Sequence, residues 1–580
     1  MIDSRGMALD ESKRTHESRV AASGAAGSLL ESARGRILLL AGFLLLALIL
    51  YRPALRGPFV SDDIAYLVTH PYTKALSLEN LLAIFDPRGP ARFYTANYEP
   101  VHLLLGAVER HIFADATPGY HLVNVAVHAL VAVLLLGCLL RVGVWPWAAL
   151  FGGIFFLVHP ANVEAVAWAS QLKSCAALAF ALGALLALPR APLASTLLFA
   201  LSLLTKATGF FALPAAAAAH WAQRRRGGDP CARGRWLVAW LGIALLYAVP
   251  QLGAFAHLGA ADTAVFDGPW AHLRGVAALG MRYALMAATA HGVSAFQEPD
   301  LAVSWLDPYW LAAIPTAGLL VWRCVATLRR GSPEAACWVA AAAAFAPVSQ
   351  ILPFATPMAD RYLYFILPGL IGGALLWAQA LWVRLLRRPD ADGGFLRRAS
   401  ARALGVLCAL GLAAFAWQST ERAALWRSET LLLVDAARHH PDGVTAHFLR
   451  ARSAAQAGDA RTAVAALQVV ADRGLDRFMA VRDDPGLAPL RGDPGFQRVI
   501  REMAGRWIAR AQARGYTTQP ELRVLGLAHL ERQEYAAAVA AFEASLRAGG
   551  PLDDAVRAEL AALRARLGDV PGTGDPGAAP

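Results

Sequence analysis

Long apolar runs separated by short polar ones occupy the chain from residue 36 to residue 419, whereas the chain from about residue 420 onward is rich in Arg, Asp and Glu. A helix of about 20 apolar residues is long enough to cross a bilayer. We therefore predict about eleven membrane spans, at 36–55, 120–141, 146–159, 164–188, 193–205, 208–222, 236–255, 309–327, 335–353, 362–384 and 402–419.

Two of these runs, 193–205 and 208–222, are short for a complete span. Irregular backbone at membrane depth is tolerated only where protein or a cavity surrounds it. We expect the two runs to form a broken pair that is hinged at Lys206.

Beyond residue 420 the apolar positions follow a helical, Ala-rich pattern. Gly526, Tyr535, Ala538 and Phe542 fit the tetratricopeptide template, and an earlier copy is expected around 446–474. The predicted fold class is all-α, a multispan membrane helix bundle followed by a soluble tetratricopeptide-type α-solenoid. The predicted regions are a polar cytoplasmic segment, a transmembrane domain, a repeat domain and a disordered tail, at 1–35, 36–419, 420–568 and 569–580.

The composition agrees with a membrane protein. Of the 580 residues 57% are hydrophobic and only 17% are charged, whereas soluble domains carry about 25% charged residues. This argues against an ordinary cytosolic enzyme and also against a disordered chain, which could not contain so much apolar surface. The net charge of +11 would suit nucleic acid, but the arginines lie between apolar runs, as in cytoplasmic loops. No nucleic-acid partner is predicted.

The arginine clusters also predict an orientation, because basic residues near span ends stay in the cytoplasm. Three loops carry them, at 224–235, 329–330 and 384–398. Placing all three inside puts the N-terminus in the cytoplasm and the repeat domain outside, in the periplasm if the protein lies in a cell inner membrane. The run at 270–296 is then interpreted as a re-entrant or interfacial helix on the outer side, because a further span there would place Arg329 and Arg330 outside.

Four polar clusters fall on the same predicted outer face. Ionisable groups at a membrane boundary are functional-site candidates, because they are unfavourable to bury. The clusters contain Asp62 and Asp63, His159 and Glu164, Lys206, and Asp360, Arg361 and Tyr362.

A carboxylate opposite cations suits the transfer of a group from a lipid phosphate. One carboxylate of the pair Asp62 and Asp63 could act as the general base, and Lys206 and Arg361 could hold the phosphate. The alternatives that remain open are a loop or helix-cap role for the Asp pair and interfacial anchoring for the two cations. No cofactor is predicted, and the sequence leaves open whether a divalent metal joins the Asp pair.

His121, Asn124 and His128 lie near one face of the predicted helix at 120–141. No carboxylate at metal-binding spacing accompanies the two histidines. We therefore expect these side chains to pack and to form hydrogen bonds between helices.

Five blocks of sequence occur in an order that resembles a known family. They are Ser61-Asp62-Asp63, Gly119–Asn124 with His128, His159-Pro160 followed by Val163–Ala167, Leu204-Thr205-Lys206, and Ala359–Tyr364. This set is similar to the transmembrane and tetratricopeptide-repeat O-mannosyltransferases and their bacterial relatives. These are C-type glycosyltransferases, multispan enzymes that use polyprenyl- or dolichyl-phosphate sugars. The resemblance covers most of residues 35–385.

The resemblance implies roles for individual residues. The acidic pair after the first span is catalytic in that family and corresponds to Asp62 and Asp63, while the Lys of the hinge and the Arg of the late motif correspond to Lys206 and Arg361. The sequence departs from the family at Glu99, where relatives commonly have an Arg before the Pro. It departs again at Ala207, where an acidic residue is frequent.

The leading hypothesis is an inverting glycosyltransferase in which a carboxylate is the base. It would move a sugar, mannose by the resemblance, from a polyprenyl-phosphate donor to a protein or other acceptor outside the cytoplasm, and the repeat domain would dock the acceptor. Besides the donor and the acceptor, the predicted partner of the protein is membrane lipid. A second hypothesis, prompted by Glu99 and Ala207, is a non-catalytic membrane-anchored repeat scaffold for protein interaction. A third hypothesis is a transporter or flippase. The position of the polar clusters argues against it, because they lie at one boundary rather than at the membrane centre.

Overall fold

The computed structural model describes residues 32–568 apart from 96, 228–230, 257–265, 267, 302, 353–355 and 387–393. The described residues form helices and no strand, which confirms the predicted all-α class. Most of the predicted polar segment at 1–35 and all of the predicted tail at 569–580 lie outside the described residues.

Within the described residues, seven helices are long and apolar enough to cross a membrane, by length and composition. A helix pair, Pro146–Leu157 and Pro160–Ala167, bends by 49° and makes an eighth span if it is counted as one. These apolar helices indicate a multi-pass membrane protein. The seven stretches are Arg34–Tyr51, Thr117–Arg141, Ala169–Ala187, Gly234–Ala254, Pro308–Arg329, Asp360–Arg384 and Arg402–Leu425.

The described part of the chain therefore has fewer candidate spans than the eleven predicted. The expected broken pair forms α10 (Pro192–Thr205) and α11 (Ala212–Arg225), each of 14 residues. Fourteen residues of α-helix reach only about 21 Å, which is less than the hydrocarbon core of about 30 Å. The run at 335–353 forms another short apolar stretch, Glu334–Val348, and the run at 270–296 forms α13 (Pro269–Thr289), which is not among the candidate spans.

Most helices of the bundle contribute to one continuous hydrophobic core that extends from Phe43 to Leu432, whereas α14 (Pro308–Arg329) contributes no residue to it. Short 3-10 segments interrupt the bundle beside α8 and α10, which is where the polar clusters lie. The helices are α2 (Ala33–Tyr51), α6 (Thr117–Arg141), α7 (Pro146–Leu157), α8 (Val163–Ala167), α9 (Leu172–Ala187), α12 (Cys231–Ala256), α14 (Pro308–Arg329), α15 (Glu334–Phe345), α16 (Asp360–Leu386) and α17 (Gly394–Leu425). The 3-10 segments are η3 (Pro160–Asn162), η4 (Ala169–Gln171), η5 (Ala207–Phe211) and η7 (Ala346–Val348).

Hydrogen bonds between helices fix α6 within the bundle. Asn124 Nδ2 donates to the carbonyl of Trp168 at 2.8 Å. The His128 ring contacts the hydroxyl of Tyr364 at 2.9 Å and the carbonyl of Leu157 at 3.1 Å. These contacts confirm the prediction that the polar face of this helix forms interhelical hydrogen bonds.

The segment between α2 and α6 folds into short helices over one end of the bundle. It has a small core of its own that includes Tyr66, Ile84 and Leu103. Because this segment follows α2 directly, it carries Asp62 and Asp63 to that end of the bundle. Its elements are η1 (Ile64–Val68, a π-helix), η2 (Pro71–Thr73), α3 (Leu78–Phe85), α4 (Ala91–Thr95) and α5 (Pro100–Phe113).

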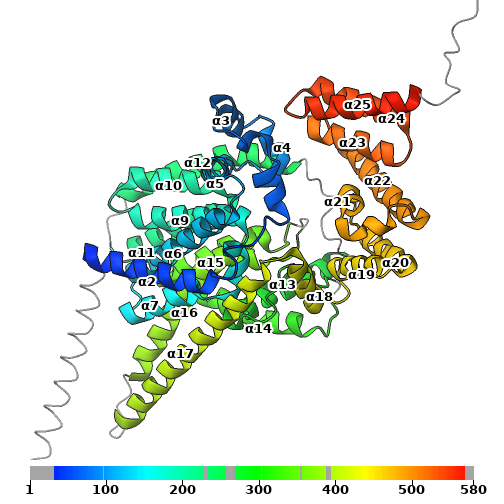
Figure 1. The fold of residues 1–580 in the computed structure, drawn as a ribbon. Coiled ribbons are helices and arrows are strands. Elements are labelled where there is room, and N and C mark those ends of the chain that lie inside the picture. The colour runs from blue at the N-terminus through cyan, green and yellow to red at the C-terminus, as the bar shows by residue number, and fades with distance from the viewer. Residues whose placement is uncertain are drawn as a thin grey trace, which may run out of the picture.

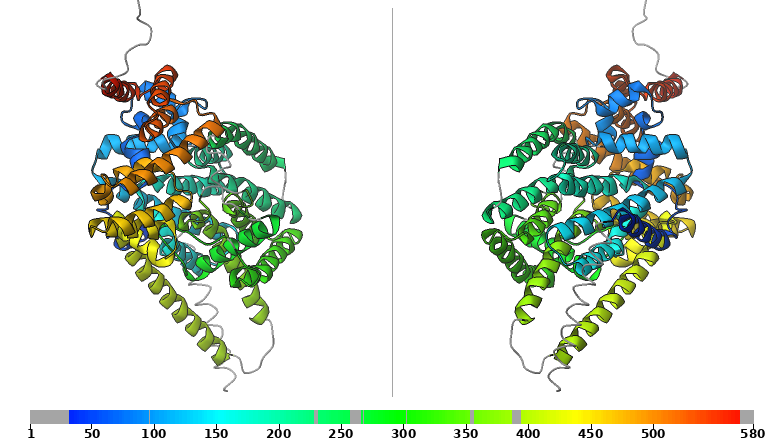
Figure 2. Two further views of the ribbon diagram at one scale, coloured as in Figure 1. Left: turned by 90° about the vertical axis from the view of Figure 1, so that its right-hand side faces the viewer. Right: turned by 90° about the vertical axis from the view of Figure 1, so that its left-hand side faces the viewer.

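The C-terminal helices stack along the right-hand side of the bundle in Figure 1 and have a second hydrophobic core that extends from Ala451 to Leu563. Helices α23 and α24 form a close pair, because a side chain at Gly526 would meet the Phe542 ring at 2.6 Å. In Figure 2 the C-terminal end of α16 and the N-terminal end of α17 project beyond the other helices, away from this stack. The C-terminal elements are α18 (Glu429–His439), α19 (Val444–Gln456), α20 (Ala460–Asp472), α21 (Phe478–Asp483), η8 (Pro485–Leu490), α22 (Pro494–Arg514), α23 (Gln519–Glu531), α24 (Tyr535–Ala548) and α25 (Asp553–Gly568).

Candidate active site

A strained turn after α2 presents the two aspartates. Ser61 has a φ of 52°, a left-handed conformation that non-glycine residues rarely adopt and that costs about 1–3 kcal/mol. Asp63 closes this turn, because its Oδ2 accepts from the backbone N–H of Val60 at 3.0 Å. Trp168 Nε1 also donates to the Val60 carbonyl at 3.1 Å. The turn is therefore fixed from within and from the bundle.

The two aspartates have different environments. Asp63 is fully buried, and its Oδ1 accepts from the backbone N–H of Ser170 at 2.7 Å. Burial raises the pKa of Asp63 to about 7, although its hydrogen bonds to Val60 and Ser170 act in the opposite direction. Asp62 is partly exposed and makes no hydrogen bond or ion pair with the described residues. The structure therefore gives Asp63 a positioning role and leaves the carboxylate of Asp62 available.

Arg361, at the start of α16, is held by Glu164 on α8. Its Nη1 forms an ion pair with Glu164 Oε1, and its backbone N–H donates to Oε2 at 2.7 Å. The guanidinium carbon lies 5.3 Å from the centre of the Trp168 ring and 5.1 Å from that of Tyr362. The charge of Asp62 also acts on Arg361. Arg361 is thus fixed in place, with a guanidinium that has donors beyond the one used by Glu164.

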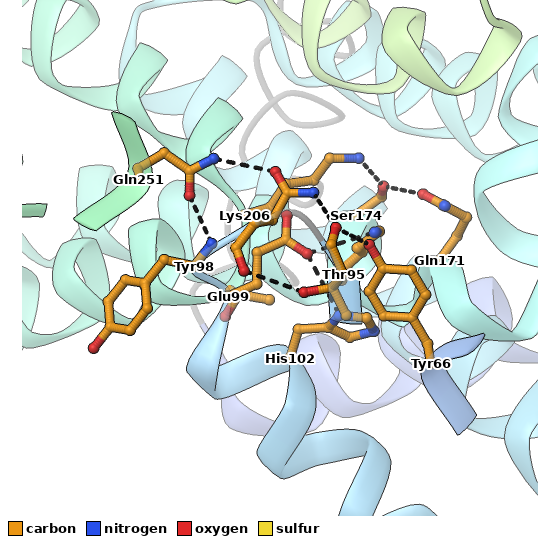
Figure 3. A network of polar contacts seen from close by, with 12 residues as sticks. Tyr66, Thr95, Tyr98, Glu99, His102, Gln171, Ser174, Lys206 and Gln251 are labelled. Carbon is orange, nitrogen blue, oxygen red and sulfur yellow. Dashed lines mark hydrogen bonds and ion pairs between the residues drawn. The ribbon is translucent and has the colours of Figure 1, made fainter. Parts of the chain in front are cut away.

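Lys206 lies at the break between α10 and η5, as the sequence predicts for the hinge. Its Nζ donates to Ser174 Oγ at 2.8 Å, and Ser174 Oγ donates to Gln171 Oε1 at 2.7 Å (Figure 3). Within the described residues Lys206 has no carboxylate at ion-pair distance. Burial and, after it, the charge of Lys173 lower the pKa of Lys206 to about 7, although the charges of Glu99 and Glu164 act in the opposite direction. Lys206 is therefore the amine of this cluster that no carboxylate neutralises directly, and a bound anion would favour its charged form.

The sequence analysis missed Lys173, the third cation of the cluster. Its Nζ lies 3.5 Å from Glu99 Oε2 and 4.1 Å from the centre of the Tyr66 ring. His102 Nδ1 is also 3.5 Å from Glu99 Oε2, and Figure 3 shows Glu99 and His102 close to Lys206. Lys173 could have been found as a single ionisable residue within the predicted span at 164–188.

Glu99 is ionised in this environment. Burial alone would raise the pKa of Glu99, but the charge of Lys173 and the contact with His102 outweigh it and lower the pKa to about 2. Gln251 on α12 holds the preceding residue, because its Oε1 accepts from the Tyr98 N–H at 3.0 Å (Figure 3). The charge of Glu99, where the sequence departs from the resembled pattern, is therefore balanced by Lys173 on α9.

The other predicted residues lie apart from this cluster or support it indirectly. His159 is fully buried, and its ring contacts the Ala287 carbonyl at 3.2 Å and accepts from the Ala161 N–H at 3.2 Å. Asp360 is buried and accepts from the Ser294 N–H at 2.9 Å and from Gln297 Nε2 at 2.7 Å. Both side chains therefore order the backbone around Glu164 and Arg361.

The cluster has the groups for proton abstraction and for anion binding. It combines the carboxylate of Asp62, which has no partner among the described residues, with Lys206 and the positioned Arg361. The described part of the chain contains no group of three His, Cys, Asp or Glu side chains that could hold a metal ion. Two cavities of about 290 and 410 Å³ occur elsewhere, and neither is lined by Asp62, Lys206 or Arg361.

Glu109 on α5 is a buried carboxyl close to Asp63. Neither of its carboxyl oxygens has a hydrogen-bond partner among the described residues. Burial, with a smaller contribution from the charge of Asp63, raises the pKa of Glu109 from 4.5 to about 9. The folded protein therefore keeps a proton that the unfolded chain releases above pH 4.5. As the pH rises from about 4.5 to about 9, this difference makes folding progressively less favourable.

We predict that Glu109→Gln stabilises the protein and does so more at high pH, because Gln has no proton to release on unfolding. The gain at pH 8 should be about 1 kcal/mol or more. The measurement is thermal unfolding of the purified protein in detergent at pH 5, 7 and 9, followed by tryptophan fluorescence. Glu79→Gln on the exposed side of α3 is the control and should show no such trend. An unchanged Tm of Glu109→Gln at all three pH values would contradict the prediction.

Comparisons with protein-family models, with curated proteins and with solved structures found no match for this chain.

Proposed function

We propose that the protein is a membrane glycosyltransferase that moves a sugar from a polyprenyl-phosphate donor to an acceptor hydroxyl. The observation that carries this proposal is the pairing of charges at one end of the bundle. Glu164 pairs with Arg361 and Glu99 with Lys173, so the carboxylate of Asp62 and the ammonium of Lys206 are left without an ion-pair partner among the described residues. A carboxylate base and an amine that can bind a phosphate, both without an ion-pair partner, are what this reaction needs.

In the proposed reaction the acceptor oxygen attacks the anomeric carbon and gives its proton to Asp62. The bond between the anomeric carbon and the phosphate oxygen breaks, and the electron pair leaves with the polyprenyl phosphate. Lys206 and Arg361 stabilise the negative charge on that phosphate. The reaction inverts the anomeric carbon, because the base and the leaving group lie on opposite faces of the sugar. No general acid is required, because the phosphate is already a good leaving group.

The resemblance to the O-mannosyltransferases supports mannose as the sugar and a protein as the acceptor. The helix pairs from α18 to α25, proposed here as tetratricopeptide-type repeats, would dock that acceptor. The arginine-rich loops support a cell inner membrane location, with the site and the C-terminal helices on the periplasmic side. This orientation requires the short apolar helices α10, α11 and α15 to cross the membrane together with the longer ones.

The alternative is a non-catalytic scaffold, which Glu99 and Ala207 prompted. One of these two residues, Glu99, forms contacts with Lys173 and His102, so its charge has partners within the site. The two hypotheses make opposite predictions, because a scaffold needs the C-terminal helices and has no use for the carboxylate of Asp62.

We predict that Asp62→Asn abolishes sugar transfer, lowering the rate by about 10²–10⁴-fold, because it removes the base. Thermal stability should change little, since Asp62 makes no hydrogen bond with the described residues. The assay is incorporation of radiolabelled sugar from a synthetic polyprenyl-phosphate donor, by membranes that contain equal amounts of each variant.

Asp63→Asn is the matched variant. In the wild type each carboxylate oxygen of Asp63 accepts from one backbone N–H, whereas Asn has a single oxygen acceptor. Asp63→Asn therefore loses one of these hydrogen bonds and should lower the free energy of unfolding by about 1–3 kcal/mol. Transfer by Asp62→Asn at the wild-type rate, with loss of the cellular phenotype only when residues 426–580 are deleted, would favour the scaffold.

The proposed orientation predicts the location of the C-terminal helices. A fluorescent reporter that matures only in the cytoplasm, fused after residue 425, should be dark, and a periplasmic phosphatase at the same position should be active. The reason is that three arginine-rich loops are held inside. A bright cytoplasmic reporter would refute the topology and would place the C-terminal helices with the cytoplasmic loops.

A further inference from the structure

A polar cavity lies where the bundle meets the C-terminal helices. It has a volume of about 410 Å³, within the range of small-molecule sites. Residues near the ends of α13, α17 and α18 form its walls, together with the beginning of α14. The lining residues are Arg282, Leu285, Met286, Ala290, His291, Gly292, Val293, Gln297, Tyr309, Met358, Gln418, Arg422, His439 and His440. We name it the junction cavity.

The lining of the junction cavity is positively charged. It contains two arginines and three histidines and no carboxylate. The nearby carboxylates are not among the lining residues and are already engaged. Asp435 binds Arg422, Asp360 accepts from Gln297, and Glu298 accepts from the N–H of Thr445. A cation in the cavity would therefore meet only positive or neutral groups, whereas an anion would find donors.

Arg282 provides the available charge. Its guanidinium carbon lies 4.1 Å from the centre of the Tyr309 ring, and within the described residues it forms no hydrogen bond or ion pair. Stacking on an aromatic face fixes a guanidinium while its N–H groups remain free for a planar or tetrahedral oxyanion. Arg422 differs, because Asp435 accepts two of its hydrogen bonds.

Neutral polar groups line the rest of the cavity. His440 Nε2 is 3.3 Å from Gln297 Oε1, and Gln418 lies on the α17 wall. These groups suit ester oxygens and hydroxyls around an anionic centre. Because the cavity is larger than a bare phosphate requires, a small organic group attached to the phosphate also fits.

We propose that the junction cavity binds a phosphate ester, held by Arg282 and by the neighbouring histidines. This site is separate from the donor cluster at Lys206 and does not depend on the proposed transfer reaction. Two sources share this chemistry, namely the headgroup of an anionic phospholipid and a phosphate ester or phosphate ion free in solution.

The test uses the purified full-length chain in detergent and measures the binding of three probes by microscale thermophoresis. The probes are inorganic phosphate, dihexanoyl phosphatidylglycerol and dihexanoyl phosphatidylcholine. We expect one or both of the first two to bind, and Arg282→Gln to raise the Kd about tenfold or more, as for loss of a hydrogen bond to a charged group. Preference for phosphatidylglycerol would identify a lipid headgroup, and preference for inorganic phosphate a soluble ligand.

Arg274→Gln is the matched control. Arg274 lies on the same helix and also stacks on an aromatic ring, that of Trp305 at 4.2 Å, but it does not line the cavity. It should leave the Kd unchanged. His291→Gln, in the exposed turn after α13, should weaken binding in the same direction as Arg282→Gln, and the Tm of each variant checks its folding. Measuring Arg282→Gln in a Lys206→Gln background removes any contribution from binding at the donor cluster.

The proposal is overturned if neither anionic probe binds the wild-type chain. It is also overturned if phosphatidylcholine binds as tightly as phosphatidylglycerol when inorganic phosphate does not bind. Equal Kd values for wild type and a folded Arg282→Gln variant would overturn it as well.

Discussion

The neutralisation of two cations at the apolar ends of helices is the interaction on which the site depends. A charge at the boundary of an apolar bundle is unfavourable unless it is paired and hydrogen-bonded. Glu164 meets this requirement for Arg361, and Glu99 meets it for Lys173. Removing either carboxylate would leave a positive charge uncompensated where α9 and α16 begin. One ion pair joins α16 to α8, and the other joins α9 to the residue before α5.

The same arrangement explains why the two aspartates differ. Asp63 uses both carboxylate oxygens to bind backbone N–H groups, one within its own turn and one at Ser170. This keeps Ser61 in its left-handed conformation and leaves Asp62 without a hydrogen-bond or ion-pair partner among the described residues. A π-helix, an arrangement that is frequent at functional sites, begins at the next residue, Ile64. Strain and irregular helix geometry thus occur together at the carboxylate that we propose as the base.

Sequence patterns predicted the helical class, the membrane character and the break at Lys206, because these depend on local composition and length. Lys173 was missed because a single cation in an apolar run was interpreted as part of the span. The partner of Arg361 could not be deduced, since Glu164 lies 197 residues away in the chain. The described residues contain fewer candidate spans than the eleven predicted, because the apolar runs at 193–205, 208–222 and 335–353 form helices that are short for a span. Which aspartate is available depends on the backbone contacts of Asp63, and these are not visible in the sequence.

Binding of a polyprenyl phosphate, the leaving group of the proposed reaction, tests the central claim most directly. The affinity of the purified chain for farnesyl phosphate can be measured for wild type, for Lys206→Gln and for Lys74→Gln, an exposed residue of the segment between α2 and α6. If Lys206 is the available cation of the site, Lys206→Gln weakens binding by about tenfold or more and Lys74→Gln leaves it unchanged. Equal affinity of the wild-type and Lys206→Gln proteins for farnesyl phosphate would contradict the account.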